Sequence, residues 1–294
     1  MNADLAAGVL VALGLVVLVL AGAIASAVVA HPERIRAGLA WIADQPAVAR
    51  VQSHYPRLWR FVRRRFMVGE VVGLALTLGV AAVLTLGMVF GQLLDSVLER
   101  DGVTVADAPV VGFLAAHREP WVITGAQVIT DIGSPVGAAL IALVVGGALA
   151  WFRRSWQPLL VMVLGAGGIG VISTAIKDLV ARGRPPQAVA ALSEHGFSFP
   201  SGHTTGTTVV WLLSAWMLTC WVLSRPALQV VVWTGALLMV VAVGVTRIYL
   251  GVHFPTDVLA GWALGAAWAV TVALAVTVWN QSDRTLLSPL RGSR

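Results

Sequence analysis

The sequence predicts an all-α fold, a polytopic membrane helical bundle with a six-helix core and one extra N-terminal transmembrane helix. Of the 294 residues, 58% are hydrophobic and only 12% are charged, whereas a soluble domain usually carries about 25% charged residues. The hydrophobic residues also gather in long runs, and a helix needs about 20 apolar residues to cross the hydrocarbon layer of a membrane.

Seven runs are long enough to span a membrane. They cover residues 5–30, 68–94, 121–150, 157–180, 203–223, 228–249 and 257–279. Arg153 and Arg154 separate the third run from the fourth, and Pro255 opens the seventh at a position where its missing N–H costs nothing. We therefore divide the chain into an N-terminal helix with a basic segment (1–67), the six-helix core (68–280) and a C-terminal tail (281–294).

Positive charge predicts the orientation of these helices. Residues 31–67 contain eight arginines, and cytoplasmic loops are the ones enriched in arginine and lysine. We place this basic amphipathic segment against the cytoplasmic membrane surface, with the C-terminus inside and the loop at 182–202 outside. The basic residues lie at the ends of apolar runs rather than in one groove, so the net charge of +6 does not indicate a nucleic-acid partner.

Three short segments on the predicted outer side contain the cationic, histidine and carboxylate residues that a phosphate-binding site needs. They are Lys177 to Arg184-Pro185, then Pro200-Ser201-Gly202-His203, and finally Arg247 to His253 and Asp257. A phosphate is best bound by cationic donors such as Lys177, Arg184 and Arg247. The helix start at Ser201 adds unpaired N–H groups, Gly202 lets the backbone approach closely, and the Ser201 hydroxyl can cap the helix or contact the phosphate.

The two histidines complete a phosphoryl-transfer site. A neutral imidazole can act as the nucleophile, and a second, protonated histidine can give a proton to the leaving group. Asp257 lies four residues after His253 and can hold one ring nitrogen while the other stays available for attack. This set needs neither a metal nor a cofactor, and the single cysteine, Cys220, has no partner within the chain for a disulfide.

This three-part pattern resembles the signature of the type-2 phosphatidic acid phosphatase superfamily, which includes membrane lipid phosphate phosphatases, bacterial acid phosphatases and vanadium haloperoxidases. The resemblance implies that residues 68–279 form a six-helix catalytic core. It implies His253 as nucleophile, His203 as acid, Asp257 as orienting carboxylate, and Lys177, Arg184, Ser201, Gly202 and Arg247 as phosphate binders. Thr246 departs from the family, which usually has serine there.

The expected function is therefore metal-independent hydrolysis of a lipid phosphate or diphosphate through a phosphohistidine. A polyprenyl diphosphate is the favoured substrate, because a site on the outer face of the bacterial inner membrane suits the recycling of such a carrier during cell-wall synthesis. Phosphatidylglycerol phosphate and phosphatidic acid are alternative substrates, and a lipid phosphotransferase is an alternative reaction. The intact histidine and aspartate set argues against a lipid transporter or scaffold with a dead site.

Three further polar residues have weaker signals. Glu194 and His195 precede the Pro-Ser-Gly-His segment, and we interpret them as solvated loop residues, with contact to a lipid head group as the alternative. Asp131 lies some ten residues into the third apolar run. We expect it to be buried, either in a contact within the bundle or in the lining of the site.

Overall fold

The computed structural model describes residues 71–291, and the environments of side chains from 76 to 280. The predicted helix at 5–30 and the basic segment at 31–67 lie outside the described residues. The α-helices are α5 (Val71–Glu99), α6 (Asp107–Ala116), α7 (Pro120–Ile132), α8 (Pro135–Arg153), α9 (Gln157–Met162), α10 (Gly168–Val180), α11 (Gly202–Trp221), α12 (Pro226–Tyr249) and α13 (Pro255–Arg291). Between residues 71 and 291 there is no β-strand, so the all-α prediction is confirmed.

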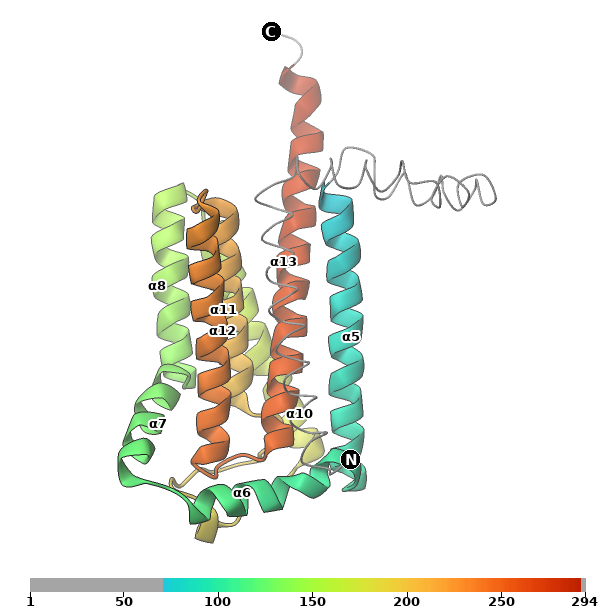
Figure 1. The fold of residues 1–294 in the computed structure, drawn as a ribbon. Helices are drawn as coiled ribbons and strands as arrows, with labels where there is room; N and C mark the ends of the chain where they lie inside the picture. The colour runs from blue at the N-terminus through green and yellow to red at the C-terminus, as the bar shows by residue number, and fades with distance from the viewer. Residues whose placement is uncertain (1–70, 292–294) are drawn as a thin grey trace, which may run out of the picture.

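The described chain contains five helical stretches that are long and apolar enough to cross a membrane. They are Leu76–Glu99, Pro135–Arg153, Gln157–Val180, Pro226–Tyr249 and Pro255–Asn280. The predicted span at 203–223 corresponds to α11, whose 20 residues include a buried row of threonines. This helix lies inside the bundle and packs against α8, α10, α12 and α13 (Figure 1). The prediction of a polytopic membrane bundle is confirmed.

The predicted single helix over 121–150 is wrong. The structure divides it into α7 and α8 at Gly133 and Ser134, and only α8 qualifies as a span. Ser134 caps α8, because its side chain accepts a hydrogen bond from the Gly137 N–H at 3.0 Å, and Pro135 follows at the first helical position. Asp131 consequently lies in the last turn of a short helix, where it is exposed, and its expected burial is also wrong.

A π-helical turn at Val163–Gly167 joins α9 to α10. Such a turn disturbs the regular hydrogen bonding of the helix, and an unsatisfied carbonyl is costly inside a membrane. Trp268 of α13 supplies the donor, since its indole Nε1–H bonds the carbonyls of Leu164 at 3.3 Å and Gly165 at 3.0 Å. This contact ties the π-helical turn, at the N-terminal end of α10, to α13.

Close packing of α11 on α13 holds the first turns of the two helices next to each other. A Cβ atom added to Gly261 would lie 3.0 Å from Cβ of Thr204, and one added to Gly265 would lie 2.8 Å from Cβ of Thr208. Small residues spaced four apart let membrane helices approach in this way. The first residues of both helices are therefore neighbours, and the Ser201 N–H donates to the Asp257 carbonyl at 3.0 Å.

The loops sort to two ends of the bundle. Residues 100–120, 181–201 and 250–254 lie at one end, which we call the α6 end, and residues 154–156 and 222–225 lie at the other (Figure 1). Exposed tryptophans mark both ends, with Trp121 near the α6 end and Trp151 and Trp156 at the opposite end. This distribution is typical of the aromatic belts at the two membrane surfaces.

Candidate active site

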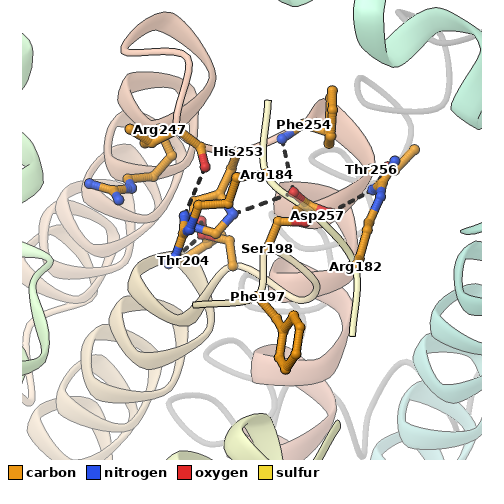
Figure 2. Close-up of polar contacts among 12 residues, drawn as sticks. Arg182, Arg184, Phe197, Ser198, Thr204, Arg247, His253, Phe254, Thr256 and Asp257 are labelled. Atoms are coloured by element: carbon orange, nitrogen blue, oxygen red, sulfur yellow. Dashed lines mark hydrogen bonds and ion pairs between the residues drawn. The ribbon is translucent and has the colours of Figure 1, made fainter. Parts of the chain in front are cut away.

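The three predicted segments meet at the α6 end of the bundle, and Figure 2 shows Arg184, Arg247, His253 and Asp257 from the first and third of them. Lys177 is in the last turn of α10, and Arg247 is in the last turn of α12. Residues 201–203 begin α11, His253 lies in the loop after α12, and Asp257 is in the first turn of α13. Residues far apart in the sequence are thus brought together by the starts and ends of four helices.

His253 is enclosed between a carboxylate and a guanidinium. Its Nδ1 lies 3.4 Å from Oδ2 of Asp257, and its Nε2 lies 3.2 Å from Nη1 of Arg184. A guanidinium can only donate, so Nε2 must hold the lone pair and Nδ1 the proton that faces Asp257. Burial lowers the pKa of His253 to about 4, although the hydrogen bond and charge of Asp257 act to raise it. The ring is therefore neutral at pH 7, with its lone pair directed toward the cations.

The two predicted arginines are held rigidly by other groups. Arg184 donates to the carbonyls of Val252 at 2.8 Å, Gly196 at 3.1 Å and His195 at 3.2 Å. Arg247 is 1% exposed, and its Nη1 donates to the hydroxyl of Thr130 on α7 at 3.1 Å. Fixed guanidinium groups lose little further freedom when they bind an anion, so they are suited to holding a phosphate.

Glu194 occupies the space between these arginines. Its Oε1 forms an ion pair with Nη2 of Arg247, and its Oε2 lies 3.6 Å from Nη2 of Arg184. Burial acts to raise the pKa of Glu194, but the hydrogen bond and charge of Arg247, helped by His203 and Arg184, bring it below its usual value. The interpretation of Glu194 as a solvated loop residue is wrong, whereas the side chain of His195 is exposed as expected.

Known proteins are similar to this chain over the region that builds the site. The sequence profile of the PAP2 superfamily matches residues 155–281. Phosphatidylglycerophosphatase B of Bacillus subtilis (strain 168) is 32% identical over 60% of this chain and 86% of its own length. The chain belongs to the PAP2 superfamily. It is a PAP2-type lipid phosphatase, and the resemblance drawn from the three motifs is confirmed.

Further relatives share the same region. The decaprenylphosphoryl-5-phosphoribose phosphatase of Mycolicibacterium smegmatis is 36% identical over 53% of this PAP2 chain and 80% of its own length. The undecaprenyl-diphosphatase of Sulfolobus acidocaldarius is 29% identical over 45% of this chain and 62% of its own length. A crystal structure of a transmembrane PAP2-type phosphatidylglycerolphosphate phosphatase from Bacillus subtilis gives a TM-score of 0.61 at 29% identity, covering 65% of this chain and 94% of that one.

The start of α11 lies beside these cations. Ser201 is fully buried and caps the helix, since its Oγ accepts a hydrogen bond from the Thr204 hydroxyl at 2.9 Å and from the Thr204 N–H at 3.5 Å. A Cβ atom on Gly202 would contact only Cε of Lys177, at 3.8 Å. His203 is close enough to Arg247, Glu194 and His253 to interact with them electrostatically. The N–H groups of Gly202 and His203 have no acceptor within the helix because of their position in its first turn.

Arg182, Asp107 and Thr256 form a second layer that the sequence did not reveal. Nη1 of Arg182 lies 2.6 Å from Oδ1 of Asp257, and Nη2 lies 2.7 Å from Oδ2 of Asp107. Asp107 belongs to no recognisable motif, and 149 residues separate it from Thr256, to which it is hydrogen-bonded. No rule of local spacing links such a pair.

An apolar groove of about 330 Å³ lies between α7 and α12. Its walls are Trp121, Val122, Gly125, Ala126 and Ile129 from α7 and Val245, Thr246 and Tyr249 from α12. Ile129 and Thr246 each directly precede a member of the hydrogen-bonded pair Thr130 and Arg247, so the groove adjoins the wall of the cation site. A Cβ atom added to Gly125 would meet no atom within 4 Å, which shows that the groove is open there.

Proposed function

We propose that this protein hydrolyses a membrane lipid diphosphate or phosphate through a phosphohistidine on Nε2 of His253. The observation that carries the proposal is the position of Glu194. Two guanidinium groups from separate elements converge on this carboxylate next to a neutral, buried histidine. A site that already holds one anion between two fixed cations is suited to hold a phosphate in its place.

The first chemical step forms one bond and breaks one. Nε2 of His253 attacks phosphorus, and the bond from phosphorus to the leaving oxygen breaks with its electron pair going to that oxygen. His203 gives this oxygen a proton. The positive charge that develops on His253 is stabilised by Asp257, which faces Nδ1 at 3.4 Å. In the second step His203 takes a proton from water, and the resulting hydroxide releases inorganic phosphate from His253.

The remaining predicted residues hold the phosphate. Lys177, Arg184 and Arg247 supply cations, and the N–H groups of Gly202 and His203 supply the dipole of a helix start. Lys177 also donates to the Phe197 carbonyl at 2.6 Å. In both hydrogen bonds of the Ser201 side chain its Oγ is the acceptor, which leaves the hydroxyl proton for a phosphate oxygen.

We infer that a hydrocarbon chain of the substrate lies in the groove between α7 and α12. The groove adjoins the cation site, and its walls are almost entirely apolar. A phosphate at the membrane surface can then stay attached to a lipid whose chain remains in the bilayer. The arginine distribution favours a position outside the cytoplasm for this end of the bundle, and we propose that the site faces outward from a bacterial inner membrane.

A polyprenyl diphosphate is the substrate we favour, because such a carrier is released on the outer face and two of the relatives are named for polyprenyl-linked substrates. Phosphatidylglycerol phosphate is the second candidate. Phosphatidylglycerophosphatase B of Bacillus subtilis is aligned over 86% of its own length, and this similarity favours phosphatidylglycerol phosphate as the second candidate. Phosphatidic acid and a phosphotransferase reaction remain subjects of the same test.

The test compares kcat/KM of the purified protein in one detergent for a long-chain polyprenyl diphosphate, phosphatidylglycerol phosphate, phosphatidic acid and a water-soluble phosphomonoester. We expect release of inorganic phosphate without an added lipid acceptor, and no loss of turnover on addition of a chelator. His253→Ala should abolish turnover and the acid-labile phosphoenzyme, and His203→Ala should slow turnover by about 10²–10⁴, as for a lost general acid. A phosphoenzyme that survives in His253→Ala would refute the mechanism.

A further inference from the structure

We propose that Arg182 is a positioning residue that holds Asp257 in the orientation facing His253, and that Asp107 and Thr256 hold Arg182 in turn. The inference rests on the proposed function, because it assigns Asp257 the task of orienting the nucleophile. The sequence assigned none of these three residues a role: Arg182 and Thr256 lie between the motif positions of the first and third segments, and Asp107 lies outside all three.

The two oxygens of Asp257 have separate partners. Oδ2 accepts the Phe254 N–H at 2.9 Å and faces Nδ1 of His253, while Oδ1 pairs with Arg182 at 2.6 Å. The side chain of Asp257 is fully buried. Because water does not reach this carboxylate, it can turn away from His253 only by breaking its charged hydrogen bond to Arg182.

Arg182 is itself held on three sides. Its Nη2 pairs with Asp107 at 2.7 Å, its Nη1 donates to the Thr256 hydroxyl at 2.8 Å, and its Cζ lies 4.5 Å from the centroid of the Phe254 ring. Asp107 is 2% exposed and accepts hydrogen bonds from the N–H and the hydroxyl of Thr256 at 3.1 and 2.5 Å. The network therefore runs from the first residue of α6, through the loop after α10, to the first turn of α13 (Figure 2 shows Arg182, Thr256 and Asp257).

The geometry separates Arg182 from the phosphate-binding cations. Its two terminal nitrogens are both occupied by carboxylates, and it approaches Asp257 rather than the Nε2 of His253. Arg184 is the guanidinium at Nε2. Burial raises the pKa of Asp107, although Thr256 and Arg182 act to lower it. Loss of Arg182 would leave two buried carboxylates without a cation, and Asp257 would then take up a proton or turn from His253.

The experiment measures kcat, KM and the vanadate inhibition constant for Arg182→Gln, Arg182→Lys and Asp107→Asn in detergent. Arg182→Gln should lower kcat about 10- to 100-fold, the usual loss when the outer partner of an active-site group is removed. KM and vanadate inhibition should change less than about threefold, because binding of the phosphate is untouched. Arg182→Lys should recover only part of the lost kcat, since a single ammonium group cannot bond both carboxylates as the two terminal nitrogens of the guanidinium do. Asp107→Asn should cause a smaller fall in kcat, and Arg100→Gln, an exposed arginine at the same end, should match the parent protein.

Two results would overturn the inference. A rise in KM and in the vanadate constant that matches the fall in kcat would mean that Arg182 binds the phosphate itself. A folded Arg182→Gln protein with the kcat of the parent would mean that the network only braces the structure. If Arg182→Gln does not fold, the same comparison of kcat with KM in Arg182→Lys and Asp107→Asn decides the question. Turnover that persists in His253→Ala would instead defeat the proposed function, whatever the Arg182 variants do.

Discussion

Nη1 of Arg184 lies 3.2 Å from Nε2 of His253, so a guanidinium covers the ring nitrogen that the proposed mechanism uses for attack. The contact fixes the tautomer, because arginine offers no acceptor. It also places a cation where the phosphate oxygens must arrive.

The first prediction concerns the ionisation of His253. Its pKa is about 4, below the ordinary value of 6.5, so the unfolded chain takes up this proton before the folded protein does as pH falls. The ring should stay neutral from pH 8 to pH 5, and its contribution to stability should be lost as pH falls through about 4. Histidine NMR of the detergent-solubilised protein, with the resonance identified by its absence in His253→Gln, would measure this. A midpoint near 6.5 would contradict it.

The second prediction concerns Glu194, which pairs with Arg247 and which the proposed function requires a phosphate to displace. Glu194→Gln removes the competing charge but keeps the shape of the side chain. Inhibition by vanadate or inorganic phosphate should tighten about 3- to 10-fold, or up to roughly 1.4 kcal/mol. Glu119→Gln is the matched control, because it removes an exposed carboxylate at the same end of the bundle. Weaker inhibition in Glu194→Gln would show instead that this carboxylate keeps the arginines in place for the substrate.

The fold and the motif residues could be predicted because they depend on local patterns. Apolar runs indicate spans, and Lys177, His203 and His253 lie in short segments with recognisable spacing. The broken helix at Gly133 was hidden because residues 121–150 are apolar on both sides of the break. In the Gly-Ser-Pro sequence there, Gly133 ends α7, Ser134 caps α8 and Pro135 begins it, and a search for apolar runs does not detect such signals.

The second layer of the site escaped prediction for a different reason. Asp107 bonds Thr256, which lies 149 positions away, and Glu194 bonds Arg247, which lies 53 positions away; both contacts depend on how the helices dock. A charged residue in an apolar sequence is a usable signal, since it needs a partner. The sequence contains too many such residues to pair them without the structure.

The third prediction tests orientation. We proposed from the arginine counts that the α6 end lies outside, so a cysteine replacing the exposed Ala188 should react with a membrane-impermeant maleimide on intact cells. A cysteine replacing the exposed Ser224, at the opposite end, should react only after the membrane is opened. Both substitutions are made in a Cys220→Ala background, because Cys220 is the only native cysteine. The reverse labelling pattern would place the site in the cytoplasm and remove the argument for an outer-leaflet carrier.

The last prediction tests whether the groove between α7 and α12 holds the lipid chain. Gly125 lines the groove, and an added Cβ there would meet no atom within 4 Å, so Gly125→Leu should fill the groove without disturbing the helices. The leucine would compete with the hydrocarbon chain for the same walls. We expect kcat/KM for the polyprenyl diphosphate to fall about tenfold, corresponding to roughly 1.4 kcal/mol of lost apolar contact.

A water-soluble phosphomonoester has no chain to place, so its kcat/KM should be unchanged in Gly125→Leu. The matched control is Gly87→Leu on α5, since Gly87 is exposed and an added Cβ there also meets no atom within 4 Å. It adds the same side chain to a membrane-facing helix away from the groove and should leave both substrates unaffected. Equal losses for the lipid and the soluble ester in Gly125→Leu would mean that the substitution disturbs Arg247 through α7. Unchanged turnover of both would place the hydrocarbon chain elsewhere on the bundle.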